Sequence, residues 1–318
     1  MAYGGTKVGT SGRYSQSGVQ GSGKIAAGFG GRAIFAGGTR ESQPSPGAQD
    51  IIDYFHIGTP ANAFDFGNLT DSRFAPTAAS DGERGVIYGG SSPGLVNILD
   101  YVTIATTGNA VDFGDGTAAR QTVGSASDGS RGVWGAGGDP TFDMIDYITI
   151  GTLGDAKDFS ELTLARAYCK ATSDASRGVF IAGYPFTDTM DYITIGTIGV
   201  ALDFGDLSQT RYAGASASNG SRGVHGGGNI PPNSRVDTID YFTFQYQSTA
   251  LDFGELSQAR RQFGATEDGS RGVWGGGTLD PPIYDTIDFL SISTLCNALD
   301  FGNLTAARTS VDAACSGA

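Results

Sequence analysis

Acidic and basic side chains recur at fixed positions along this chain, and their types and spacing raise the question of catalysis. Asp-Phe-Gly begins at Asp65, Asp112, Asp203, Asp252 and Asp300, with Asp158-Phe159-Ser160 as the one variant. In protein kinases such a triplet holds a metal ion, but only beside a Gly-rich loop, a strand lysine and a catalytic His-Arg-Asp, and this sequence has none of these. Five copies of one triplet therefore indicate a structural role.

Twelve of the sixteen arginines also occupy repeated positions. One set follows each Asp-Phe-Gly segment or its variant: Arg73, Arg120, Arg166, Arg211, Arg260 and Arg308. A second set opens an Arg-Gly-Val motif or a looser form of it: Arg32, Arg84, Arg131, Arg177, Arg222 and Arg271. An active site needs one asymmetric cluster of residues, whereas a charged residue that recurs in all six copies is typical of an ion pair that stabilises packing. We therefore expect structural Asp–Arg pairs between strands or blades, with the aspartate of the Ile-Asp-Tyr marker as one candidate partner and with charge-assisted hydrogen bonds to loop groups.

Few other residues could do chemistry. His56 and His225 stand where sister copies carry other residues, so both are interpreted as substitutions within a repeat. Acidic turns such as Asp112 with Asp115 lack the dense ligand series of a Ca²⁺ loop. Three cysteines cannot form a disulfide framework, and packing of a small side chain is favoured over a nucleophilic role for Cys169, Cys296 and Cys315. We predict no catalytic residue, no metal and no cofactor.

All these residues belong to a repeat that fills almost the whole chain. Successive triplets are 47, 46, 45, 49 and 48 residues apart. Within a copy, a period of two between turn residues is typical of four short strands and no helix. In one copy we expect strands at 263–266, 271–275, 286–293 and 298–304. Asp268-Gly269 predicts a type I′ turn between the first two strands, with both residues at positive φ.

Four-stranded units of this length, repeated radially, are the blades of a β-propeller. We predict an all-β fold over residues 31–318: a six-bladed propeller with four antiparallel strands per blade. The first strand of each copy is dominated by Ala, Ser, Thr and Gly, which suits a crowded axis, and the triplet Phe should pack between blades. The chain ends on a first-strand segment and starts, near Arg32, on a second-strand one. The C-terminal strand should therefore complete the N-terminal blade and close the ring.

The repeat resembles a known family in several features. Four features resemble the kelch repeat: Gly-Gly after the second strand, an acidic–aromatic pair in the third, an aromatic residue then Leu in the fourth, and Arg before the next copy. Phe replaces the usual Trp of that family. Three longer motifs are more narrowly similar to repeats in virion proteins of marine phages, including cyanophages: Ser-Arg-Gly-Val-Trp-Gly-Gly-Gly, Ile-Asp-Tyr-Ile-Thr-Ile and Asp-Phe-Gly-Asp-Leu. The resemblance implies a kelch-like propeller and a virion protein made in the host cytoplasm.

The opening segment differs from the repeats in composition and charge. Residues 1–30 contain nine glycines and no repeat marker, and their basic residues are Lys7, Arg13 and Lys24. The first forty residues carry +5 and the remainder −18, which together give the net charge of −13. We expect residues 1–30 to be a Gly/Ser-rich basic arm that anchors the chain to other virion proteins. An unstructured tail is the alternative.

The charge and hydropathy patterns also bear on partners. An acidic body repels phosphates, so we expect no nucleic-acid partner. No segment reaches the roughly 18 consecutive apolar residues of a membrane helix, so we expect no membrane insertion.

Variation among the copies is concentrated between the second and third strands. These segments span 39–49, 91–96, 139–143, 184–189, 229–238 and 278–286. Rigid scaffolds place recognition chemistry on loops, so this face is our predicted binding surface. Its candidate residues are Phe142, Tyr184, Phe186, Pro231, Asn233, Arg235 and Tyr284. Neutral insertions at a rim are the alternative.

Together these features favour a non-enzymatic, tail-associated virion protein that attaches to host-surface glycan. One alternative is a capsid-decorating or purely structural module whose loops contact other virion subunits. A more remote alternative is a propeller-type enzyme, such as a glycan hydrolase or a copper oxidase. The sequence offers that enzyme no distinctive acid pair and no His/Tyr/Cys cluster.

Overall fold

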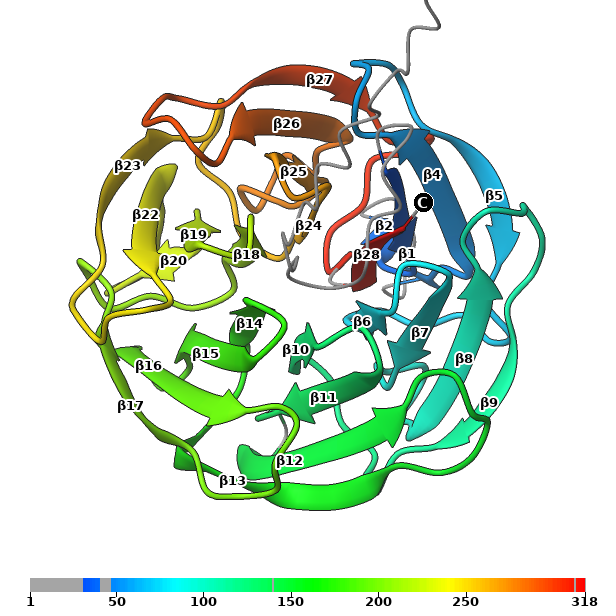
Figure 1. Cartoon of the computed structure of the whole chain (residues 1–318). Helices are drawn as coiled ribbons and strands as arrows, with labels where there is room; N and C mark the ends of the chain where they lie inside the picture. Colours follow the sequence, from blue (N-terminus) through cyan, green and yellow to red (C-terminus); the bar gives the residue numbers. More distant parts are fainter. Residues whose placement is uncertain (1–30, 41–46, 139, 312, 318) are drawn as a thin grey trace, which may run out of the picture.

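The computed structural model describes residues 31–40, 47–138, 140–311 and 313–317, the last five as backbone only. Within these ranges the chain forms β-strands and no helix. Six four-stranded sheets surround one axis as the blades of a propeller (Figure 1), and two further sheets are two-stranded hairpins. The prediction of an all-β, six-bladed propeller is confirmed. No helix of the described residues could cross a membrane.

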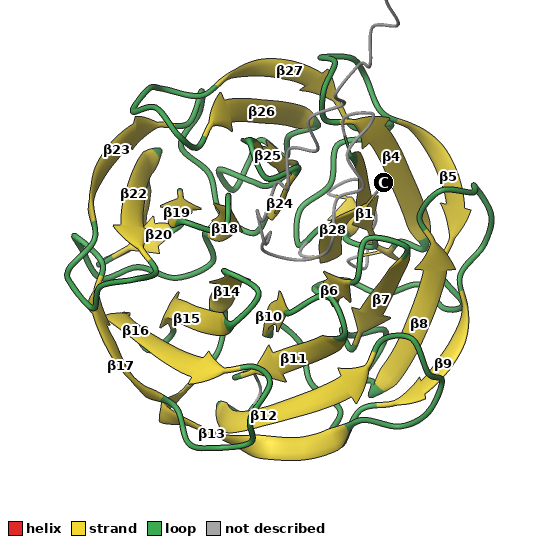
Figure 2. Cartoon of the chain, viewed as in Figure 1, coloured by secondary structure: helices red, strands yellow, loops and turns green. Residues whose placement is uncertain are grey.

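The first three blades run from an inner to an outer strand in the following order (Figure 2). Blade 1 contains β28 (Ala313–Gly317), β1 (Arg32–Ala36), β4 (Ile51–His56) and β5 (Phe64–Asn68). Blade 2 contains β6 (Thr77–Ser80), β7 (Arg84–Tyr88), β8 (Ile98–Thr103) and β9 (Val111–Asp115). Blade 3 contains β10 (Gly124–Ser127), β11 (Arg131–Gly135), β12 (Phe142–Thr149) and β13 (Lys157–Arg166).

The other three blades have the same order. Blade 4 contains β14 (Lys170–Ser173), β15 (Arg177–Gly183), β16 (Thr187–Thr194) and β17 (Leu202–Asp206). Blade 5 contains β18 (Ala215–Ser218), β19 (Arg222–Gly226), β22 (Thr238–Thr243) and β23 (Leu251–Glu255). Blade 6 contains β24 (Gly264–Glu267), β25 (Arg271–Gly275), β26 (Thr286–Ser291) and β27 (Leu299–Asn303). The hairpins pair β2 (Thr39–Arg40) with β3 (Gly47–Ala48), and β20 (Asn229–Ile230) with β21 (Ser234–Arg235).

Small side chains let the inner strands converge on the axis. The strands β6, β10, β14, β18, β24 and β28 are successive neighbours around the ring. Serines join some of them: Ser173 Oγ donates a hydrogen bond to Ser127 O, and Ser218 Oγ donates one to Ser173 O, each of 2.7 Å. Lys170 and Glu267 are the charged exceptions among the described inner side chains, and both are buried.

The apolar core is divided into six clusters, each between two neighbouring blades. In one, Phe66 of blade 1 packs with Val102 and Ile104 of blade 2. In another, Phe301 of blade 6 packs with Phe55 and Ile57 of blade 1. The other four clusters each contain one triplet phenylalanine: Phe113, Phe159, Phe204 and Phe253. The prediction that these rings pack between blades is confirmed.

Buried ion pairs hold each blade to the chain segment that enters it. Arg120 Nη2 lies 2.6 Å from Asp146 Oδ2, with both side chains fully buried. Asp146 also accepts a 2.6 Å hydrogen bond from Thr117 Oγ1, which follows the outer strand of the preceding blade. The remaining pairs are Arg73–Asp100, Arg166–Asp191, Arg211–Asp240, Arg260–Asp288 and Arg308–Asp53. The predicted structural Asp–Arg pairing is confirmed.

The second arginine set connects neighbouring blades. Arg131 of blade 3 donates a 2.7 Å hydrogen bond to Ile195 O of blade 4, and its guanidinium lies 4.5 Å from the centre of the Tyr147 ring. Arg271 of blade 6 likewise donates to Ile57 O of blade 1, at 3.1 Å. Stacking on the Tyr147 ring keeps the Arg131 guanidinium over its own blade while it reaches the next.

The turn between the inner and second strands differs from the prediction. Gly269 has a positive φ of 78°, but Asp268 does not, so this turn is not type I′. Instead, Asp268 Oδ1 accepts hydrogen bonds from the backbone N–H groups of Ser270 and Arg271, at 2.9 and 2.8 Å. The side chain of Asp268 thus makes the hydrogen bonds of an Asx-turn, which mimics a backbone turn. The chain can then reverse with a positive φ at Gly269 alone.

Candidate recognition face

The described parts of the variable segments lie beside the links that lead into each blade. One isolated antiparallel bridge per blade joins the two: Thr39–Thr309, Phe74–Ser91, Gln121–Gly138, Ala167–Tyr184, Tyr212–Asn229 and Arg261–Thr278. In an antiparallel blade, the connection from the second to the third strand and the link entering the first strand emerge at the same end. These segments and links together form what we call the loop face.

A belt of backbone hydrogen bonds supports the loop face around the axis. Six non-glycine residues in the entering links have positive φ values between 53° and 61°: Ala75, Thr122, Tyr168, Ala213, Gln262 and Ser310. The N–H of one donates to the C=O of its counterpart in the preceding blade, as in Gln262 to Ala213 (2.8 Å) and Ser310 to Gln262 (2.7 Å). Positive φ is costly for such residues, so the neighbouring blades impose it. The belt fixes the links in place.

Four aromatic rings gather on the loop face where blades 4 and 5 meet. The ring centre of Tyr212 lies 5.4 Å from that of Tyr168, 5.5 Å from that of Tyr184 and 5.1 Å from that of Phe186. The interplanar angles of 55° to 70° are tilted or edge-to-face, an arrangement that attracts aromatic pairs. Tyr184 is 47% exposed. The cluster therefore presents a partly exposed, fixed aromatic surface.

Charged groups continue this surface across blades 5 and 6. Arg261 Nη1 donates to Tyr212 Oη at 3.3 Å, and Arg261 Nη2 donates to Asp280 Oδ2 at 2.5 Å. Arg235 Nη2 contacts the same carboxylate oxygen, and its Nη1 donates to Asn233 O at 2.7 Å. We call the combined group the recognition patch; it comprises Tyr168, Tyr184, Phe186, Tyr212, Arg235, Arg261 and Asp280.

The structure brings some of the predicted binding residues together and separates others. Tyr184, Phe186 and Arg235 lie in the patch, and Asn233 supports it through its carbonyl oxygen. Pro231 is exposed in the turn between β20 and β21.

The other predicted residues lie elsewhere. Phe142 pairs with Arg166 at the start of β12, and Tyr284 is half-buried in blade 6, where its N–H donates to Gly277 O. The arm residues Lys7, Arg13 and Lys24 lie outside the described residues. Their predicted roles, and that of the loop face, stay predictions.

Sequence reasoning missed Tyr168, Tyr212, Arg261 and Asp280. The first three lie within two residues after a buried repeat arginine, in links that otherwise look uniform. The sequence does contain a sign that these links vary, because the residue directly after the repeat arginine differs in every copy: Phe74, Gln121, Ala167, Tyr212, Arg261 and Thr309. Asp280 lies in a variable segment, but its partners come from other parts of the ring.

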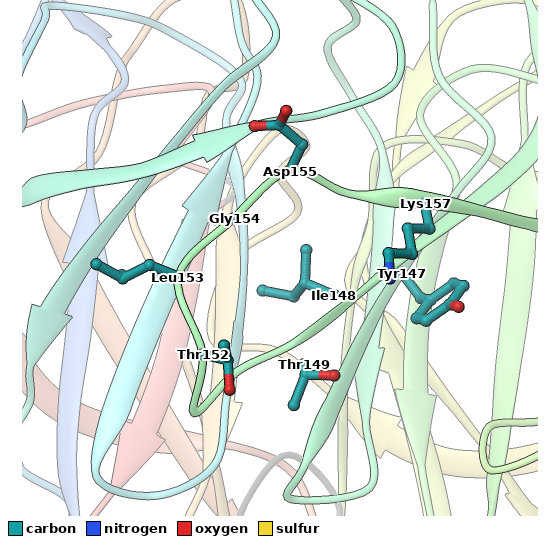
Figure 3. Close-up of a pocket in the computed structure, with 8 residues that line it drawn as sticks. All are labelled: Tyr147, Ile148, Thr149, Thr152, Leu153, Gly154, Asp155 and Lys157. Atoms are coloured by element: carbon teal, nitrogen blue, oxygen red, sulfur yellow. The ribbon is translucent and has the colours of Figure 1, made fainter.

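Two hollows lie at the opposite end of the blades, in the hairpins between third and outer strands. One of about 350 Å³ lies between β12 and β13, and its lining includes Tyr147, Leu153, Asp155 and Lys157 (Figure 3). An equivalent hollow of about 290 Å³ lies between β16 and β17. Because the feature recurs at the same repeat position, and Asp155 already accepts a 3.0 Å hydrogen bond from the Asp115 N–H, we regard it as part of the blade architecture.

Two potentially reactive side chains, His225 and Cys169, are enclosed in the scaffold, whereas His56 is exposed and Cys296 is half-buried. His225 Nδ1 lies 2.8 Å from Ser216 Oγ, and burial, followed by Arg211 and Lys170, lowers the pKa of His225 well below its usual 6.5. Burial raises the pKa of the Cys169 thiol, which disfavours the nucleophilic thiolate. Over the described ranges, no three His, Cys, Asp or Glu side chains gather in a way that could hold a metal ion.

Comparison with known proteins adds no family assignment. A scan against protein-family models gives no match, and a search of curated proteins gives no significant match either. The functional proposal therefore depends on the geometry of the loop face and on the repeat resemblance.

Proposed function

We propose that this protein is a non-enzymatic recognition module and that the recognition patch binds a host-surface glycan. The observation that carries the proposal is the partly exposed aromatic cluster around Tyr212, bordered by guanidinium and carboxylate groups. A sugar ring has an apolar C–H face that can stack on aromatic rings and a rim of hydroxyls that can hydrogen-bond to Arg and Asp. Binding sites commonly combine such an apolar surface with a few polar groups.

The proposed setting is a phage particle. The kelch-like and virion-like character of the repeats supports a tail-associated structural protein in the virion, made in the host cytoplasm. The opposite charges of the first forty residues and the rest of the chain, +5 and −18, support residues 1–30 as the anchor to other virion proteins.

Closure of the ring by the C-terminal strand is also part of this proposal. β28 pairs antiparallel with β1, with Cys315 opposite Ile34 in the register, and joins the two ends of the described chain within blade 1. We propose that this pairing keeps the four-stranded, kelch-like blade 1 intact. The loop face would then be held as a single rigid surface.

A second candidate function is a purely structural or capsid-decorating module. Large apolar side chains are exposed at hairpin tips in four consecutive blades, including Leu153 (55%), Ile198 (57%), Tyr246 (69%) and Leu295 (54%). Exposed apolar groups of this kind can mark contacts with other proteins. A particle map would distinguish the candidates, because attachment requires a tail position with the loop face outward, whereas decoration requires a place in the shell lattice.

Binding to a glycan array and to host cells tests the proposed function. The double variant Tyr184→Ala/Phe186→Ala removes two aromatic contacts of the type that commonly dominate binding, and should weaken it by at least about tenfold. Tyr246→Ala is the matched control, because it removes an exposed tyrosine, 69% accessible, at the opposite end of a blade. Equal binding by the wild type and the double variant would contradict the proposal, and turnover of the bound glycan would contradict its non-enzymatic part.

A further inference from the structure

We infer that the recognition patch selects an anionic saccharide and that Arg235 and Arg261 hold its acidic group. This inference rests on the proposed function, and it adds the chemical class of the ligand. The acidic group is a carboxylate or a sulfate, because each has two or more charged oxygens that can accept hydrogen bonds from guanidinium N–H donors.

The first support is the charge balance within the patch. The guanidinium groups of Arg235 and Arg261 both approach Oδ2 of Asp280. Two positive charges therefore share one carboxylate, which leaves the group with a local charge of +1. This excess stands on a body whose residues after position 40 carry −18. Acidic residues dominate that body, so a positively charged site on its loop face differs in sign from its surroundings. An anionic ligand would complement this site.

The second support is the partial burial of these charges. The side chain of Arg235 is 9% exposed, that of Arg261 is 20% exposed and that of Asp280 is 35% exposed. The Nε atoms of both arginines are buried and have no hydrogen-bond partner within the described part of the chain. Burial, and then the charge of Arg261, lower the pKa of Arg235. A ligand anion would face partly desolvated cations, where Coulombic attraction exceeds its value in bulk water.

The third support is that the groups are held in place before a ligand arrives. Arg235 Nη1 donates to Asn233 O at 2.7 Å, within the β20–β21 hairpin. The Asp280 N–H donates to Thr278 Oγ1 at 2.9 Å, and Asp280 has a positive φ of 65°. Fixed side chains lose less conformational entropy on binding, which favours affinity.

The fourth support is the direct connection between the charged and aromatic parts. Arg261 donates to the hydroxyl of Tyr212, the ring at the centre of the aromatic cluster. A sugar stacked on Tyr184 or Phe186 could therefore direct an acidic substituent towards Arg261. A neutral sugar would use the aromatic surface and leave the excess positive charge unpaired.

The test uses saccharides that share a backbone and differ in the substituent that carries the charge. Manno-, cello- and maltooligosaccharides are each prepared as neutral, C6-oxidised (uronate) and sulfated forms, and binding to the full-length protein is measured on an array and by calorimetry. The acidic form of at least one backbone should bind at least about tenfold more tightly than its neutral form, which is the usual effect of one charge-assisted hydrogen bond. Preference for uronate or sulfate identifies the source of the charge. This binding should weaken as salt is raised.

Variants separate the inference from the proposed function. Arg235→Gln and Arg261→Gln should each weaken binding of the acidic form at least about tenfold and binding of the neutral form by less, which removes the preference for the acidic form. Lys157→Gln is the control, because it removes one positive charge from the exposed rim at the opposite end of blade 3. Equal binding of neutral and acidic forms, or an unchanged preference in both arginine variants, would overturn the inference but leave the proposed function standing. Failure of the whole panel to bind would overturn both.

Discussion

At the scale of single residues, repetition assigns charged side chains to the scaffold. Asp146 contacts Arg120 and Thr117, and the guanidinium of Arg120 also donates to the carbonyl oxygens of Ala136 and Met144. This network buries both charges completely while satisfying them with hydrogen bonds. Such pairs are unlike the patch group around Asp280, where one carboxylate serves two arginines and remains 35% exposed.

Removal of one partner of a buried pair should be strongly destabilising. Arg120→Met leaves the Asp146 carboxylate buried without its cation, so we expect the free energy of unfolding to fall by about 3–5 kcal/mol. Arg120→Met/Asp146→Asn removes the uncompensated charge as well and should be more stable than the single variant. Urea unfolding followed by circular dichroism measures both. A double variant as unstable as the single one would contradict a charge-based role.

His225 should make stability depend on pH. Its folded-state pKa is lowered well below 6.5, mainly by burial, so the unfolded chain takes up a proton that the folded chain excludes. This contribution to stability is complete above pH 6.5 and is lost as the pH falls below it, by up to about 1.4 kcal/mol per pH unit.

His225→Phe should flatten this dependence, because sister blades carry Phe35 and Phe180 in the same position. Unfolding midpoints in urea at pH 7.5 and pH 5.5 test this for the wild type and the variant. The wild type should lose about 1 kcal/mol more than the variant over this interval. Equal losses would show that His225 is not the titrating group.

At the scale of elements, five of the six outer strands approach the next blade so closely that they require a residue without a side chain. Gly254 in β23 has a φ of +151°, and a Cβ there would lie 2.5 Å from Cys296 O of blade 6. Gly67, Gly114, Gly205 and Gly302 have similar φ values, between +135° and +147°. Ser160 is the exception in blade 3, where the residue does not have a positive φ.

Gly254→Ala should therefore separate two blades locally. We expect it to lower the free energy of unfolding by about 1–3 kcal/mol, from backbone strain and a close contact. Gly199→Ala, in the hairpin between β16 and β17, is the matched control, because a Cβ there meets no atom within 4 Å. The control should change stability by no more than about 0.5 kcal/mol. Similar effects of the two substitutions would disprove the close-approach argument.

The sequence was sufficient for the strands that every copy repeats, but not for the type of turn at Asp268-Gly269. Strand β25 begins and ends where predicted, at Arg271 and Gly275, while β26 ends at Ser291, two residues before the predicted end. The belt of backbone hydrogen bonds was not predictable. Local preference disfavours positive φ at its residues, such as Ala75 and Ala213, and contacts between blades impose that conformation.

The recognition patch was only partly predictable for a related reason. Tyr184 and Arg235 were identified from the variability of their loops. Their partners come from other links and loops: Tyr212 lies 28 residues after Tyr184, and Asp280 lies 45 residues after Arg235. Arg261, from a further link, contacts both Tyr212 and Asp280. One sequence shows which segments vary, but the ring decides which of the varying residues meet.

At the scale of the whole molecule, the ends of the repeat array meet in one sheet. β1 pairs with β4 on one side and with β28 on the other. Without β28, the backbone N–H and C=O groups on one edge of β1 would be unpaired next to the axis. An unpaired edge of this kind invites aggregation.

Deletion of residues 313–318 should therefore open the ring. We expect a Tm lower by at least about 10 °C, and aggregation visible by light scattering, because several kcal/mol of strand pairing are lost. A chain extended by six Gly-Ser residues at its C-terminus is the control and should melt like the wild type. A truncated chain that stays soluble and keeps the wild-type Tm would contradict the closure proposal.

The central claim is that a rigid six-bladed scaffold binds its ligand through variable residues on the loop face of blades 4 to 6. Hydrogen–deuterium exchange of the full-length protein, with and without a bound glycan, tests this most directly. The account predicts slower exchange at 184–186, 211–213, 233–236 and 278–281, and unchanged exchange at the hairpins around Leu153 and Tyr246. Protection confined to those hairpins, with none on the loop face, would contradict it.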